Sequence, residues 1–78
     1  MSFSELPQIS GKEAVRVYEK VGWRYRGKES GHFVLTKEGF WQNLSIPDHK
    51  RLDKGLLHKQ NKYAGITDKK FREIYDSL

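Results

Sequence analysis

The chain is 78 residues long and carries 15 Lys and Arg against 10 Asp and Glu, a formal net charge of +5 at pH 7. This length fits one small domain, 1–78, with a single layer of helices on a small sheet. The absence of cysteine excludes a disulfide framework and a thiolate metal site. The basic balance fits nucleic acid as a partner, although an ordinary basic surface fits it equally well.

No stretch of the sequence approaches the ~20 apolar residues that a membrane-spanning helix needs. The segment Met1–Pro7 has neither the basic nor the apolar region of a signal peptide. We therefore expect a soluble, cytoplasmic protein that does not enter a membrane.

After a short lead-in, 1–9, the first predicted element is a helix over residues 11–21. Ser10 and Glu13 stand at the S-x-x-E spacing of a capping box, in which each side chain accepts a hydrogen bond from the other residue's backbone amide. One apolar helix face follows in Ala14, Val15, Tyr18 and Val21. Gly22 supplies a left-handed residue that ends the helix.

Three strands are expected next, over Trp23–Arg26, His32–Leu35 and Phe40–Ile46. Residues 29–31 read as a loop between the first two strands, and residues 37–39 as a hairpin turn whose glycine takes a positive φ. In the third strand, alternation places Phe40, Gln42, Leu44 and Ile46 on one face and Trp41, Asn43 and Ser45 on the other.

Pro47 ends the third strand, and a charged loop, 48–52, leads to Asp53 as the N-cap of a second helix that ends at Gly65. Its apolar stripe is Leu56, Leu57, Gln60, Tyr63 and Ala64. Thr67 caps a last helix. The apolar face of that helix is Phe71, Ile74, Tyr75 and Leu78. The order is that of an α+β, double-stranded-RNA-binding-domain-like fold, α-β-β-β-α with an extra C-terminal helix.

His32 is the candidate catalytic residue. It stands where the polar loop meets the second strand, and alternation turns it away from Phe33 and Leu35. A histidine side chain gives or takes a proton near neutral pH, which suits general acid–base catalysis. Histidine in such a place is also an ordinary exposed strand residue, so its type alone does not decide between the two.

Several short motifs stand in a fixed order around His32. They are Ile9-Ser10-Gly11-Lys12-Glu13, Val21-Gly22-Trp23, Ser30-Gly31-His32, Pro47-Asp48-His49, Lys54-Gly55-Leu56-Leu57 and Ala64-Gly65-Ile66. From about Leu6 to Leu78 the chain resembles the HicA (YcfA-like) toxin family. The motifs are similar to the family's opening, its first helix end, its G-S-x-H and P-x-H motifs, its K-G-T-L helix start and its A-G-I ending.

The resemblance implies an mRNA interferase, a toxin ribonuclease that needs no metal or cofactor and is neutralised by a HicB-type antitoxin. His32 would act as general acid or base while the 2′-hydroxyl of the RNA attacks the adjacent phosphate. The antitoxin would cover His32 and the basic surface. Two residues depart from the family pattern: Glu29 replaces glycine and Leu56 replaces threonine. The Glu29 carboxylate either repels phosphate or pairs with Lys28.

A cation near the histidine is needed to balance the charge that builds on the phosphate. Arg26 and Lys28 are the nearest in sequence. The other candidates for RNA binding are Ser30, His49, Lys50, Arg51, Lys54, Lys59 and Lys62. The alternative for the lysines and arginines is an ordinary solvated face, and for His49 an exposed loop residue.

The remaining aromatic residues and histidines receive structural roles. We expect Trp23 and Phe40 in the core, and Trp41 either in the core or stacked on bases. His58 is expected on a solvated basic helix face. The three histidines do not stand at the spacings of a metal site. Two other functions remain open: a non-catalytic RNA-binding module, in which the basic second helix binds RNA, and a purely protein-binding domain.

Overall fold

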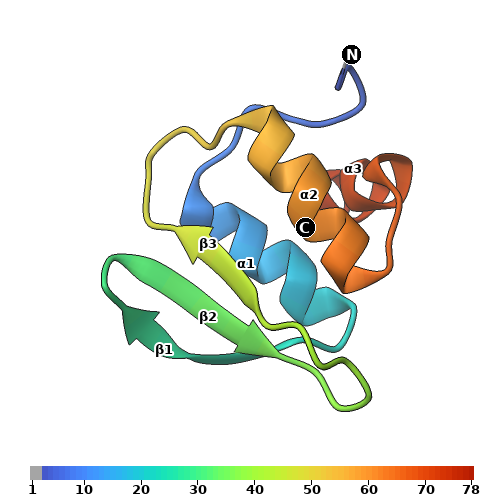
Figure 1. Ribbon diagram of the computed structural model, residues 1–78. Coiled ribbons are helices and arrows are strands. Elements are labelled where there is room, and N and C mark those ends of the chain that lie inside the picture. The colour runs from blue at the N-terminus through green and yellow to red at the C-terminus, as the bar shows by residue number, and fades with distance from the viewer. Residues whose placement is uncertain (1–2) are drawn as a thin grey trace.

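The computed structural model describes residues 3–78, which form three helices and three strands (Figure 1). In chain order they are α1 (Gly11–Lys20), β1 (Arg24–Glu29), β2 (His32–Thr36), β3 (Leu44–Pro47), α2 (Lys54–Ala64) and α3 (Asp68–Asp76). The α+β class and the order of elements in the sequence prediction are confirmed. No helix within residues 3–78 has the length and apolar character needed to cross a bilayer.

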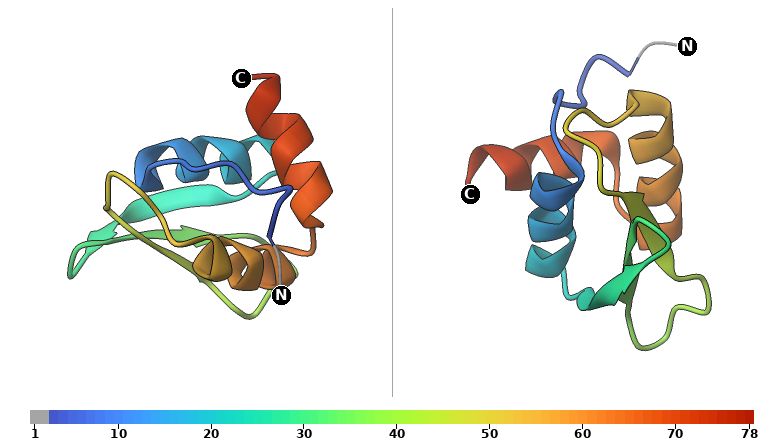
Figure 2. Two further views of the ribbon diagram at one scale, coloured as in Figure 1. Left: turned by 90° about the horizontal axis from the view of Figure 1, so that it is seen from above. Right: turned by 90° about the vertical axis from the view of Figure 1, so that its left-hand side faces the viewer.

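The three strands form one antiparallel sheet in the order β1-β2-β3. Helix α1 lies over one face of this sheet, and α2 lies along the side of β3 (Figure 2). The Gln60 side chain of α2 accepts a hydrogen bond from the Ser45 amide of β3 at 3.3 Å. We call the sheet face opposite α1 the outer face. On β1 and β2 it carries Arg24, Arg26, Glu29, His32, Val34 and Thr36.

The predicted starts of the three helices are confirmed by their N-caps, and α1 ends at Lys20, one residue before the predicted end. The Glu13 amide donates to Ser10 Oγ at 3.2 Å, and Glu13 Oε1 accepts from the Ser10 amide at 3.0 Å. This backbone hydrogen bond holds the pKa of the Glu13 carboxyl below its usual value. Asp53 and Thr67 cap α2 and α3 with one hydrogen bond each, accepted from the Leu56 amide at 3.1 Å and from the Lys70 amide at 3.0 Å. Caps of this kind form within one turn of chain, which is why local sequence predicts them.

Residues 3–9 of the lead-in contribute to the core, which the sequence did not indicate. Leu6 and Ile9 are buried, and the Ile9 carbonyl accepts from the Leu52 amide at 2.8 Å. The lead-in thereby fixes the chain that runs from β3 to α2. The other buried apolar residues are Ala14, Val15, Val17, Tyr18, Trp23, Phe33, Leu35, Leu44, Ile46, Leu52, Leu57, Ala64 and Phe71.

A polar network joins the three helices inside this core. The buried Tyr18 hydroxyl of α1 donates to Asn61 Oδ1 of α2 at 2.7 Å, and Asn61 Nδ2 donates to Asp68 Oδ1 of α3 at 3.0 Å. Burial raises the pKa of Tyr18 far above its usual value, so the phenol remains a donor. Each buried polar atom of the pair thus has a partner, as a stable interior requires.

The expectation that His58 lies on a solvated basic face is wrong. Its ring packs against Phe3 with centroids 4.8 Å apart and the ring planes tilted by 36°, and its Nδ1 lies 2.8 Å from Asp68 Oδ2. Asp68 is ten positions further along the chain, so only the packing of α2 against α3 shows this partner. His58 therefore extends the polar network.

Strand β3 is shorter than the predicted Phe40–Ile46, because its partner β2 ends at Thr36 and pairs Leu35 with Leu44. Residues 37–43 form a loop instead. Phe40 lies in this loop, where its ring packs against Trp23 with centroids 5.2 Å apart. Leu44 and Ile46 are buried and Ser45 is exposed, so the alternation holds where the strand exists.

The predictions that Trp23 and Phe40 are core residues have different outcomes. Trp23 is in the core as expected, but Phe40 is 39% exposed and is not a core residue. Trp41, which the sequence left open, is 91% exposed. Leu78 is also not part of the buried face of α3, since it lies beyond the helix and is 40% exposed.

The Tyr18 hydroxyl should contribute measurably to stability. Replacing Tyr18 by Phe leaves the Asn61 carbonyl oxygen buried without its donor, and we expect a loss of about 1–3 kcal/mol in the free energy of unfolding. Urea denaturation followed by circular dichroism measures this loss. Tyr25→Phe, at a tyrosine that is 44% exposed, is the control and should change stability by less than ~0.5 kcal/mol. Equal effects of both substitutions would contradict the structural role of the network.

Candidate functional site

Strands β1 and β2 are joined by a two-residue turn, Ser30–Gly31. Strand β1 runs three residues further than predicted, to Glu29, which pairs with His32. Ser30 has φ 51° and Gly31 has φ 79°, and two positive φ values are what a type I′ hairpin turn requires. The predicted loop 29–31 is therefore a tight turn that fixes where His32 begins β2.

His32 is exposed on the outer face, while Phe33 and Leu35 are buried on the α1 side, as alternation predicted. Its ring Nδ1 lies 3.1 Å from the Ser30 carbonyl oxygen. In the tautomer with its proton on Nδ1, the ring donates to this carbonyl, and Nε2 is then the unprotonated nitrogen. The turn thus orients an imidazole whose basic nitrogen is not the one bound to the backbone.

The turn meets two other segments at one end of the sheet, which we call the turn end (Figure 1). The Asp48 amide, just after β3, donates to the Gly31 carbonyl at 3.0 Å. The Gly11 amide, at the start of α1, donates to the His49 carbonyl at 2.9 Å. A Cβ on Gly11 would collide with the Pro47 carbonyl oxygen, so the close approach of α1 to the end of β3 depends on glycine.

Lys28 forms an ion pair with Asp48 across the turn end. Its Nζ lies 2.7 Å from Asp48 Oδ2 and 5.8 Å from the centre of the Phe33 ring. The hydrogen bond to Lys28 holds the pKa of the Asp48 carboxyl below its usual range, and the charges of Lys12 and His49 act in the same direction. The pKa of Lys28 is raised by the same bond. Lys28 is therefore bound to Asp48, and the carboxylate that neutralises it is not Glu29.

A β-bulge explains why Lys28 and His32 do not share a face. The register shifts between Tyr25, which pairs with Leu35, and Gly27, which pairs with Val34. Gly27 has φ 115°, a conformation that favours glycine. The extra residue reverses the alternation of β1. Lys28 consequently points to the α1 side, and the expectation that it is a nearby cation for His32 is not supported by its position.

The other candidates for RNA binding fall into separate groups. Ser30 and His49 lie at the turn end, and the exposed Lys50 and Arg51 continue the loop from His49. The remaining three lie on α2, where Lys54 is half-buried and Lys59 and Lys62 are exposed. The structure thus places one group around His32's turn and a second along a helix beside β3.

The structure adds two basic residues that the sequence prediction omitted. Lys12 lies in the first turn of α1, and its charge lowers the pKa of Asp48. The two residues are far apart in the sequence, so this proximity is seen only once α1 is packed against the sheet. Arg24 stands opposite Thr36 on the outer face. The signal for Arg24 was present in the sequence, since it is two positions from Arg26 in a segment of alternating aromatic and basic residues.

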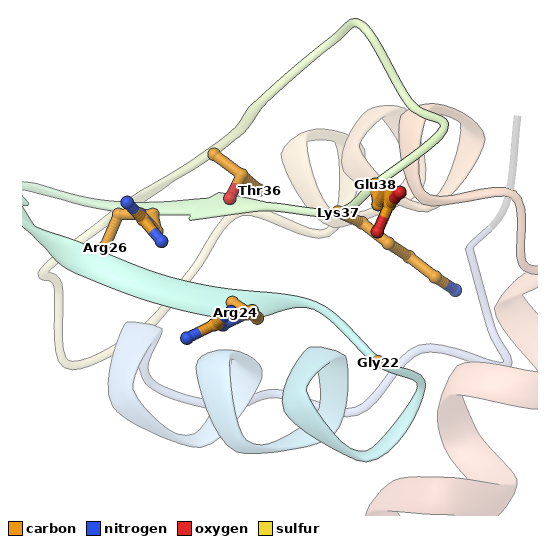
Figure 3. A pocket seen from close by; sticks show the side chains of 6 residues that line it. All are labelled: Gly22, Arg24, Arg26, Thr36, Lys37 and Glu38. Atoms are coloured by element: carbon orange, nitrogen blue, oxygen red, sulfur yellow. The ribbon is translucent and has the colours of Figure 1, made fainter.

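Arg24 and Arg26 line an open hollow of ≈ 660 Å³ on the outer face (Figure 3). Thr36, Lys37, Glu38 and Gly22 complete its lining. Lys37 Nζ donates to the Val21 carbonyl at 2.7 Å and lies 5.2 Å from the centre of the Phe40 ring. The two arginines therefore supply the free cationic groups of the hollow, and Glu38 supplies its carboxylate.

Comparison with models of known protein families, with curated proteins and with solved structures finds no match to this chain. Within residues 3–78, no three histidine, aspartate or glutamate side chains gather as a metal ion would require. The geometry around His32 and the basic groups beside it therefore carries what is inferred about function.

Freeing Lys28 should strengthen the attraction of the turn end for phosphate. Asp48→Asn removes the carboxylate that pairs with Lys28, and we expect affinity for a short uncleavable 2′-O-methyl RNA to rise about 2- to 5-fold at low salt, the scale of one exposed ion pair. Fluorescence anisotropy measures it. Asp76→Asn on α3 is the matched control, because it makes the same charge change away from the turn end. Equal affinities of the two variants would remove Lys28 from the RNA-binding surface.

The same ion pair gives a pH dependence with a definite sign. The fold lowers the pKa of the Asp48 carboxyl, so the contribution of the ion pair to stability is present above the pKa of the unfolded chain and is lost as pH falls through the folded pKa. Protonation of Asp48 frees Lys28, as the Asp48→Asn substitution does. The wild-type RNA affinity should therefore approach that of Asp48→Asn at acidic pH. A constant ratio between the two proteins down to acid pH would contradict this.

Proposed function

We propose that the chain is a small ribonuclease, a HicA-type toxin that cleaves mRNA by metal-independent general acid–base catalysis at His32. The observation that supports this most is the exposed His32 imidazole, whose Nδ1 lies 3.1 Å from the Ser30 carbonyl oxygen. A base has to be held in place to contribute its usual factor of about 10²–10⁴ in rate. The type I′ turn supplies that positioning.

In this mechanism the 2′-hydroxyl oxygen of the RNA attacks the adjacent phosphorus. The O2′–P bond forms, the P–O5′ bond breaks, and the products end in a 2′,3′-cyclic phosphate and a 5′-hydroxyl. His32 Nε2 accepts the proton of the 2′-hydroxyl, and the departing 5′-oxygen takes up a proton from solvent. Arg26 lies on the same outer face as His32 and is the candidate cation for the phosphate charge.

The partner that fits this proposal is a HicB-type antitoxin, acting in the cytoplasm. Covering the turn end would block His32 together with the basic loop that holds Lys50 and Arg51. We further propose that the α-β-β-β-α part of the chain is double-stranded-RNA-binding-domain-like, with α3 as the additional helix.

A second function, a non-catalytic RNA-binding module, is favoured by one observation. Glu29 pairs with His32 on the outer face, whereas Lys28 lies on the other face and is bound to Asp48. The histidine thus has a carboxylate rather than a lysine as its cross-strand neighbour, which opposes the approach of a phosphate. In this alternative the basic loop and α2 bind RNA and His32 takes no part.

Replacing His32 by Ala distinguishes the two functions. The first predicts that cleavage of a short RNA in EDTA falls by about 10²–10⁴-fold, while affinity for uncleavable RNA is largely kept. Denaturing gels and mass spectrometry of the product ends measure the rate and the cyclic phosphate. Asn43→Ala, at an exposed and uncharged residue of the loop 37–43 that is outside the proposed site, is the control and should leave the cleavage rate unchanged.

Cleavage that is equal in wild type and His32→Ala would show that His32 is not the catalyst. Binding without cleavage by the wild type would favour the RNA-binding module. In that case Glu29→Gln, which removes the carboxylate opposite His32, tests whether this residue suppresses catalysis. Cleavage gained in that variant and lost again with His32→Ala would restore the ribonuclease mechanism.

A further inference from the structure

The hollow on the outer face has the composition of an anion site. Arg24 and Arg26 are exposed, and within residues 3–78 neither forms an ion pair with a carboxylate. Figure 3 shows both side chains on β1, with Thr36 on the neighbouring strand. An arginine binds a phosphate through two parallel N–H donors, so two free arginines on one strand form a surface that suits a phosphate chain.

We propose that Arg24 and Arg26 form a phosphodiester-binding subsite for an RNA strand that runs along the outer face toward His32. This inference rests on the proposed function, since it names where the substrate of His32 continues. It assigns RNA contact to the face opposite α1, where the sequence prediction had named Arg26 and the structure adds Arg24.

The shape of the outer face between the two sites supports an extended strand as the occupant. On β1, Gly27 has no side chain, and opposite it Val34 is small and half-buried. Among residues 3–78, the outer-face positions between the arginines and His32 therefore carry no bulky side chain, and the Glu29 carboxylate lies beside His32 at the end of this path. Residues two apart on a strand are ~7 Å apart, a separation comparable to that of successive phosphates in an extended RNA strand. Arg24 and Arg26, the second of them at the bulge, line one hollow, and such a pair of guanidinium groups suits neighbouring phosphates of one strand.

The hollow also carries a carboxylate, Glu38, at its rim. It lies on the loop after β2, whereas the arginines lie on β1. Two arginines against one carboxylate leave the hollow cationic, which favours a polyanion over a cationic segment. The other polyanion that fits is an acidic segment of a protein, and the experiment separates it from RNA.

The test uses Arg24→Gln/Arg26→Gln in the full chain and an uncleavable 2′-O-methyl RNA. We expect affinity at low salt to fall by about 10-fold or more. The negative slope of log K against log[salt] should become shallower by about 1.4, which is ~0.7 for each phosphate contact of a single strand. Arg16→Gln/Lys20→Gln, two exposed residues of α1, makes the same charge change on the other side of the sheet. Its salt slope should remain near the wild-type value.

Each contrary outcome has a distinct meaning. If both double variants lose affinity equally, the effect is net charge alone and the subsite is overturned. If Arg24→Gln/Arg26→Gln binds RNA like wild type but loses binding to a polyglutamate peptide, the face serves an acidic protein and the RNA subsite is overturned. Neither result changes the expected effect of His32→Ala on cleavage, so the ribonuclease proposal is tested independently by that variant. A wild type that binds no RNA at low salt overturns both.

Discussion

The hydrogen bond from Tyr18 to Asn61 is the contact on which the arrangement of the helices depends. Tyr18 belongs to the helix that covers the sheet, and Asn61 to the helix that lies along β3. Asn61 in turn donates to Asp68, at the start of α3. In a chain this short the apolar core is small, so a satisfied polar chain across three helices restricts their relative positions in a way that non-directional apolar packing does not.

The site depends on this arrangement indirectly, through the segments that the helices hold in place. The end of α1 that begins at Gly11 binds the loop after β3 through His49, and that loop binds the hairpin turn through Asp48. His32 is thus positioned by a turn that is itself fixed by a hydrogen bond from the loop after β3. Catalytic and binding side chains on tight turns gain precision from such support, because a free turn alone would move.

Features that are local in the sequence were predicted well. The three helix caps and the direction of His32 relative to Phe33 each involve residues within four positions. The errors concern partners that are distant in the sequence. Lys28 and Asp48 are 20 positions apart, and Phe40 leaves its strand to reach Trp23. The sequence prediction also ended the first strand at Arg26, whereas β1 continues to Glu29 through a bulge that no residue pattern in the sequence showed.

The bulge in β1 affects how this chain should be compared with others. One additional residue beside Gly27 exchanges the two faces for everything between it and the turn. An alignment that crosses this point without a gap would match Lys28 or Glu29 with residues that point the opposite way in an unbulged strand. In such an alignment, identical residue types would conceal that the charges lie on different faces of the sheet. A gap of one residue at the bulge would instead align residues that lie on the same face. For this hairpin, the position of one gap carries more information about the two surfaces than the similarity of the residues around it.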